Sequence, residues 1–167
     1  LARNEDELFQ CTGKELDLLW HAPEYKDTEI IKRANSIVPS KAQLDFCDLE
    51  FIALVPFGMN TFTNSEVGTG REPEKYFNPA ELDVAQWDSV IRVGGVKALV
   101  LTCKYSDGFC LWPSEYTEFS VKNSPWLDGK GDLVKLVSDE CRKQELKFGI
   151  YVSPYDMHED SFGTAKY

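Results

Sequence analysis

Residues 83–102 read DVAQWDSVIRVGGVKALVLT, and this stretch decides the fold. Asp83 and Gln86 have the spacing of a capping box, in which each side chain satisfies a free backbone N–H at the start of a helix. Gly94, which begins a Gly-Gly pair, is typical of a helix end. Residues 98–102 form a continuous apolar run, as in a strand covered on both faces. The stretch therefore predicts a helix followed closely by a buried strand.

The same pattern is found on both sides of this stretch. Residues 51–55 (FIALV) predict an earlier buried strand, Asp132 begins a second amphipathic helix, and residues 148–152 (FGIYV) predict a third strand. The order strand, helix, strand, helix, strand indicates a parallel sheet with right-handed crossovers. Long loops follow each strand, at residues 56–79, 103–130 and 153–167. A functional site is expected at this edge, because sites in parallel α/β folds gather at the C-terminal ends of the strands.

Residues 1–47 are only weakly periodic, with short helices predicted at 15–20, 28–34 and 41–48. We therefore divide the chain into an N-terminal extension, residues 1–47, and an α/β domain, residues 48–167. The sequence opens on Leu1, without an initiator Met, and its first ten residues lack the pattern of a signal peptide. The expectation is a processed chain or a piece of a longer one.

The 167 residues carry 18 Lys+Arg and 28 Asp+Glu, for a net charge of −10, and 43% of them are hydrophobic. This balance argues against binding to nucleic acid or to an anionic membrane, and no apolar run is long enough to span a bilayer. The five cysteines form no C-x-x-C pair and predict no disulfide framework. Residues 156–160 (DMHED) fit no fixed metal geometry and are interpreted as a solvated acidic loop, so no metal and no cofactor are expected.

Several short motifs follow one another in register. They are IVPS (37–40), FGMNTFT (57–63), FNP (77–79), DGFCLWPS (107–114), SVKNSPW (120–126) and FGIY (148–151) with Ser153-Pro154. Together they resemble the N-terminal part of the retaining α-L-fucosidases over about residues 37–167. The resemblance implies a partial (β/α)₈ barrel and a family activity that removes terminal fucose from glycans. It also implies an Asp nucleophile and a Glu or Asp acid/base on later strands beyond Tyr167, so no catalytic residue is expected in this chain.

The sugar-pocket positions implied by the resemblance fall on six residues: Pro56, Glu66, Val67, Tyr105, Ser106 and Tyr155. The family has His in place of Pro56, Trp in place of Val67, and two His in place of Tyr105 and Ser106. It usually has Trp in place of Tyr155. Each buried sugar hydroxyl that loses its partner costs about 1–3 kcal/mol, so these substitutions weaken a monosaccharide site.

Three interpretations follow. The first, which we favour, is a non-catalytic, fucosidase-derived structural or interaction subunit whose partners are protein chains that cover the open barrel edges. The second is the N-terminal fragment of an active fucosidase that missing residues or another chain complete. The third is a module that binds a fucosylated glycan, supported by the aromatic loops. The resemblance suggests a secretory, lysosomal or extracellular setting, although no glycosylation sequon occurs and the compartment stays unassigned.

Overall fold

The computed structural model describes residues 27–167. The chain divides into two units, residues 1–44 and residues 45–167. Helix α2 (Asp27–Ser36) lies in the first unit, and helix α3 (Lys41–Cys47) spans the division. Both helices were predicted, whereas the helix predicted at residues 15–20 lies outside the described part. The division after residue 47 that the sequence suggested stays a prediction.

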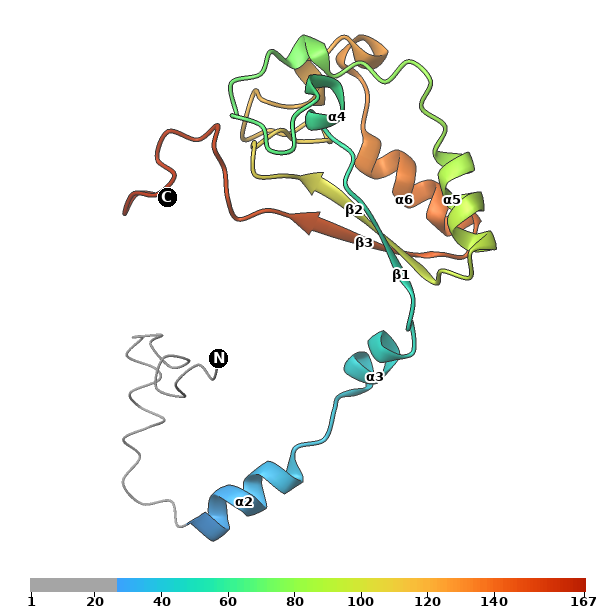
Figure 1. Ribbon diagram of the computed structural model, residues 1–167, viewed down its shortest axis with the longest axis vertical. Helices are drawn as coiled ribbons and strands as arrows, with labels where there is room; N and C mark the ends of the chain where they lie inside the picture. Colours follow the sequence, from blue (N-terminus) through green and yellow to red (C-terminus); the bar gives the residue numbers. More distant parts are fainter. Residues whose placement is uncertain (1–26) are drawn as a thin grey trace, which may run out of the picture. The chain divides into compact units, whose positions relative to one another are not determined.

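The second unit is built on three parallel strands (Figure 1): β1 (Ile52–Val55), β2 (Ala98–Lys104) and β3 (Lys147–Val152). Their order in the sheet is β1-β2-β3, and the parallel pairing was predicted. In the register, Leu54 pairs with Val100, and Leu101 pairs with both Val55 and Ile150. Because the strands are parallel, their C-terminal ends and the loops that follow them lie at one edge of the sheet.

Two helices connect the strands, namely α5 (Val84–Val93) and α6 (Leu133–Lys143). The Asp83 side chain accepts the Gln86 N–H at 2.9 Å, and the Asp132 side chain accepts the Lys135 N–H at 2.9 Å. Both helices therefore begin at the capping residues that the sequence indicated. They pack on the same face of the sheet (Figure 1).

The hydrophobic core lies between this helical face and the sheet. Leu99 and Leu101 of β2 are fully buried against the apolar side of α6, where Leu133 and Val137 are also fully buried. A second part of the core lies under the loops beyond the strand ends, and its largest members are Phe77, Phe109, Phe119 and Trp126. Core packing therefore continues directly beneath the edge where a site was expected.

The outer strands are far more exposed than their sequences predicted. Leu54 of β1 is 61% exposed, and Ile150 of β3 is 60% exposed. Leu54 pairs with Val100 on the face turned away from α5 and α6, and within residues 45–167 that face carries no helix. Ile150 pairs with Leu101 and so lies on the face that α5 and α6 cover elsewhere. No helix of the described chain follows β3, so nothing packs over Ile150 at this edge of the sheet. The prediction of a buried strand holds for β2, most of whose side chains are buried, and is wrong for β1, while β3, predicted as the third strand, is largely exposed.

The loops contain short helical turns: α4 (Asn60–Thr63) and η2 (Glu74–Tyr76) after β1, then η3 (Val121–Asn123) and η4 (Trp126–Gly129) after β2. The sequence predicted these regions as loops, and it gave no signal for the short turns within them. Among residues 27–167, no helix has the length and apolar character needed to cross a membrane.

Candidate functional site

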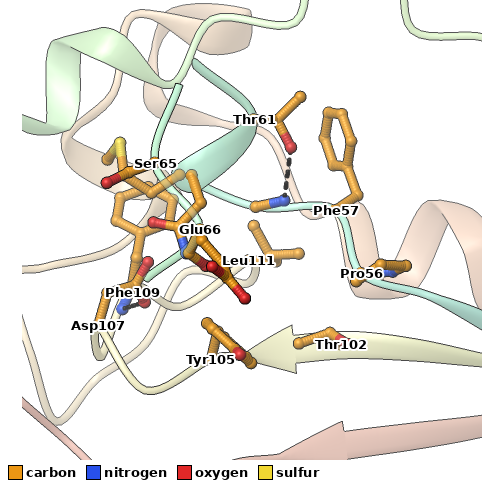
Figure 2. A pocket seen from close by; sticks show the side chains of 13 residues that line it. Pro56, Phe57, Thr61, Ser65, Glu66, Thr102, Tyr105, Asp107, Phe109 and Leu111 are labelled. Carbon is orange, nitrogen blue, oxygen red and sulfur yellow. Dashed lines mark hydrogen bonds between the residues drawn. The ribbon is translucent and has the colours of Figure 1, made fainter. Parts of the chain in front are cut away.

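A cavity of about 360 Å³ lies at the C-terminal ends of β1 and β2 (Figure 2). Pro56 and Phe57, directly after β1, form one wall. Thr102 of β2 and Tyr105 in the following loop form another. Glu66 reaches the cavity from the loop that follows α4. The position agrees with the expectation that a site lies at this edge of a parallel sheet.

Three of the six predicted pocket residues come together here. Pro56, Glu66 and Tyr105 all line the cavity, although they come from two different loops. Pro56 has no side-chain hydrogen-bonding group, so the wall that it forms offers a ligand no donor from its side chain. Glu66 is exposed and presents a carboxylate, which is an acceptor when ionised.

The other three predicted residues do not line this cavity. Val67 is exposed beside Glu66, and the backbone oxygen of Ser106 accepts the Met157 N–H at 2.9 Å. The Tyr155 ring packs against the Phe162 ring, with 5.3 Å between their centroids. A role for these three side chains in binding a ligand stays a prediction.

Asp107 is a pocket residue that the sequence reasoning did not select. It is 1% exposed, and its Oδ1 accepts the Phe109 N–H at 2.9 Å (Figure 2). Burial raises the pKa of the Asp107 carboxyl, the Phe109 N–H opposes the shift, and the charges of Glu72 and Asp156 add to it. An acidic residue so soon after a buried strand, at the C-terminal edge of the sheet, was the available signal.

Asn60 is a second pocket residue that was not selected. Its Nδ2 donates to the Glu66 backbone oxygen at 3.3 Å, while its Oδ1 is buried without a hydrogen-bond partner in the described chain. A Cβ atom at Gly68 would lie 2.7 Å from Asn60 Oδ1 and 2.8 Å from Asp107 Cβ. Only glycine therefore fits at this position, because the side chains of Asn60 and Asp107 both pack against it.

The segment after β3 contacts the loops beside the cavity through an ion pair, a ring stack and a hydrogen bond. Lys104 Nζ and Asp156 Oδ2 are 2.7 Å apart in a mostly buried ion pair. The His158 ring stacks on Phe119, with 4.4 Å between centroids, and its Nδ1 lies 2.7 Å from the Gly70 backbone oxygen. These contacts join the loops that follow all three strands, so the cavity wall is held by long-range interactions within this chain.

The cavity contains no imidazole or thiolate. The chain has two histidines, of which His21 lies outside the described residues and His158 is held by the loop contacts just described. Burial raises the pKa of Cys103 and of Cys110 to about 11, so both thiols are neutral near pH 7. Within residues 27–167, no group of three His, Cys, Asp or Glu side chains is arranged to hold a metal ion.

Comparison with known proteins gives a consistent result. A family model described as alpha-L-fucosidase matches residues 53–167. The chain is 42% identical over 126 residues to alpha-L-fucosidase 1 of Arabidopsis thaliana, and 33% identical over 91 residues to the human plasma alpha-L-fucosidase. The first match covers 75% of this chain and the second 53%.

Solved structures show the same relationship. A glycoside hydrolase 29 family member from a rumen bacterium superposes with a TM-score of 0.76 at 45% identity, over 78% of this chain and 24% of that one. A GH29 fucosidase of Ruminococcus gnavus, solved in complex with fucose, gives 0.70 at 34% identity, over 76% of this chain and 26% of that one. The chain spans about a quarter of the length of the plant relative, 25% of it.

Proposed function

Because this chain belongs to the α-L-fucosidase family, we propose that it supplies the first three strands of a fucosidase-type barrel and acts there as a non-catalytic structural or interaction subunit. The observation that carries the proposal is the open sheet. Parallel sheets are normally covered on both faces. Here Leu54 and Ile150 point large apolar side chains into solvent from opposite faces of the two edge strands.

The exposed sheet supports a partner chain for an energetic reason. Burying one side chain of the size of Leu54 or Ile150 stabilises an assembly by about 1.5–3 kcal/mol. Within residues 27–167 no further strand pairs with the outer edges of β1 and β3, and such open edges favour association with another strand. A polypeptide that continued the sheet past either edge would satisfy both requirements at once.

The residues of the pocket support a non-catalytic role. A retaining glycosidase needs two carboxyl groups about 5–5.5 Å apart on opposite sides of the scissile bond. Of the two carboxyl groups that line the cavity, Asp107 is almost fully buried and accepts a backbone N–H. The family resemblance places the nucleophile and the acid/base beyond Tyr167. The same resemblance puts a histidine where Pro56 stands, so a donor to the sugar is missing as well.

One observation favours a second candidate function. In this candidate the chain is the N-terminal part of an active fucosidase, and missing residues or another chain complete the enzyme. Glu66 remains exposed at the cavity, and its carboxylate makes no hydrogen bond to another described residue. A free acidic side chain at a sugar-pocket position is what a working enzyme would retain. The two candidates share the requirement for a covered sheet and differ only in turnover.

Reassembly with a relative separates the candidates. The chain is combined with the C-terminal remainder of the Arabidopsis thaliana relative, and release of nitrophenol from an aryl fucoside is measured. The matched positive control is the relative's own N-terminal segment in the same reassembly. We expect no turnover with the native chain. We expect turnover after Pro56→His, Val67→Trp, Tyr105→His, Ser106→His and Tyr155→Trp are introduced together.

Turnover by the native chain would contradict the proposal of a non-catalytic subunit. If the native chain supports turnover within about tenfold of the control, a difference of about 1.4 kcal/mol in transition-state stabilisation, the pocket substitutions do not abolish catalysis and the second candidate is correct. Binding of the two segments, measured separately by gel filtration, shows whether the barrel has reassembled before activity is compared.

A further inference from the structure

The dipeptide Asp-Gly occurs twice in the chain, at residues 107–108 and 128–129. In such a pair the backbone nitrogen of the glycine can attack the side-chain carboxyl of the aspartate, because glycine has no Cβ to hinder the approach. The carboxyl loses its OH and the nitrogen loses its hydrogen, so water leaves and a five-membered succinimide ring forms. Water then opens the ring, and addition at the main-chain carbonyl gives isoaspartate, in which the backbone runs through the former side chain.

The pair at residues 128–129 is open to this reaction. The Asp128 side chain is exposed and makes no hydrogen bond or ion pair with another residue of the described chain. No described residue outside the short turn η4 accepts the Gly129 N–H. The carboxyl and the nitrogen that must meet are therefore held by no contact from a distant part of the described chain.

The backbone of this turn is itself unfavourable. Leu127 and Asp128 have φ of 51° and 55° and ψ of 36° and 38°, in the left-handed region that residues with a Cβ avoid. Rotation out of this region, which ring closure requires, relieves strain instead of breaking a regular helix. The turn also requires the glycine, because a Cβ at Gly129 would lie 2.4 Å from the Lys122 backbone oxygen.

The pair at residues 107–108 has the same two residues in the opposite surroundings. Asp107 is 1% exposed, and its Oδ1 accepts the Phe109 N–H at 2.9 Å. Gly108 is buried, and its N–H donates to the Tyr105 backbone oxygen at 3.1 Å. The carboxyl and the attacking nitrogen are both held, and burial keeps out the water that opens the ring.

We propose that Asp128 is a site of spontaneous isoaspartate formation and that the fold protects Asp107 from the same reaction. The product adds one carbon to the main chain within η4, between the buried Trp126 and the residue that caps α6, Asp132. The inference goes beyond the proposed function, because it concerns a modification of the chain and not whether a completed barrel hydrolyses fucosides.

The test is to age the 167-residue chain at neutral pH and to quantify isoaspartate at both pairs by peptide mapping. The isomers have equal mass, and electron-transfer fragmentation distinguishes them. In the folded chain we expect the reaction at Asp128 to be at least about tenfold faster than at Asp107, where local unfolding must come first. In guanidinium chloride the two rates should agree within about threefold, because the fold no longer separates the two pairs.

Variants confirm the position. In Asp128→Glu the longer side chain would have to close a six-membered ring, so the isomer peak of this peptide should be lost. Asp48→Glu is the matched control, because Asp48 is exposed and is followed by leucine, and it should leave that peak unchanged. Equal rates at the two pairs in the folded chain would overturn the proposal. So would a folded chain that forms no isoaspartate at residue 128, or an isomer peak that persists in Asp128→Glu. None of these results bears on fucoside turnover in the reassembled barrel, so the two proposals fail separately.

Discussion

Asp88 on α5 provides a test of how this core tolerates charge. Its side chain has no exposed surface, and neither carboxylate oxygen accepts a hydrogen bond from an N–H or O–H group of the described chain, which leaves the Cys141 thiol as a weak donor beside it. Burial raises the pKa of the Asp88 carboxyl, the neighbouring Cys141 thiol on α6 opposes the shift, and the charge of Glu140 adds to it. A buried acceptor without a partner costs about 1–3 kcal/mol. We predict that Asp88→Ala stabilises the chain.

The magnitude has three contributions. Removing the unpartnered carboxylate recovers about 1–3 kcal/mol at pH 7. Alanine is also the better helix former, by up to about 0.7 kcal/mol. The small cavity left beside Cys141 offsets part of this gain. The expected net increase in the free energy of unfolding is about 1–3 kcal/mol, which for a chain of this size raises Tm by about 2–4 °C per kcal/mol.

The pH dependence has a definite sign. Because the pKa of Asp88 is raised in the folded state, the folded chain holds this proton more tightly than the unfolded chain does. Native stability is therefore lost as pH rises from the unfolded pKa, about 3.9, through the folded pKa. The advantage of Asp88→Ala over the native chain should grow over that range and then level off.

Urea unfolding followed by circular dichroism, at pH 4 and at pH 7, measures both effects. Ser89→Ala is the matched control, because Ser89 is exposed on the same helix and its replacement changes helix propensity without changing the core. The reasoning is refuted if Asp88→Ala lowers stability at pH 7. It is also refuted if the gain over Ser89→Ala is the same at both values of pH.

Three further predictions concern the frame of the site. Asp132→Ala removes the cap of α6 and should cost about 1 kcal/mol in urea unfolding, whereas equal stability would mean that the Lys135 N–H finds another partner. Asp156→Asn leaves Lys104 unpaired in a mostly buried position and should cost about 3 kcal/mol, while a loss below about 0.5 kcal/mol would show that water replaces the pair. Burial raises the pKa of Cys141 to about 12, so this thiol, with Cys103 and Cys110, should resist a thiol reagent at pH 8 until the chain unfolds, whereas the exposed Cys47 should react at once. Rapid labelling of three or more of the five cysteines in the folded chain would contradict the packing described for the core.

The regular elements were predictable because their determinants are local. Asp83 and Asp132 begin helices through bonds to residues three positions later, and an apolar run such as residues 98–102 is long enough to specify a strand. Strand exposure was not predictable in this way. Leu54 and Ile150 have the sequence context of buried residues, and their exposure depends on elements that pack beside the sheet rather than on their neighbours in sequence.

The candidate site was predictable in position and only partly in composition. Parallel topology placed it at the C-terminal edge, and the family motifs selected Pro56, Glu66 and Tyr105, which line the cavity. Asn60 and Asp107 were missed because their role depends on Gly68, which lies against both in space. Contacts of this kind join separate loops and leave no periodic signal in the sequence.

The mass of the native species tests the central claim most directly. Native mass spectrometry of the chain from its natural source should find it bound to further polypeptide in a species well above 19.0 kDa. Leu54→Glu with Ile150→Lys, which place charges on the two exposed sheet faces, should release the chain from that species. A lone, stable chain of 19.0 kDa, unchanged by these substitutions, would contradict the account.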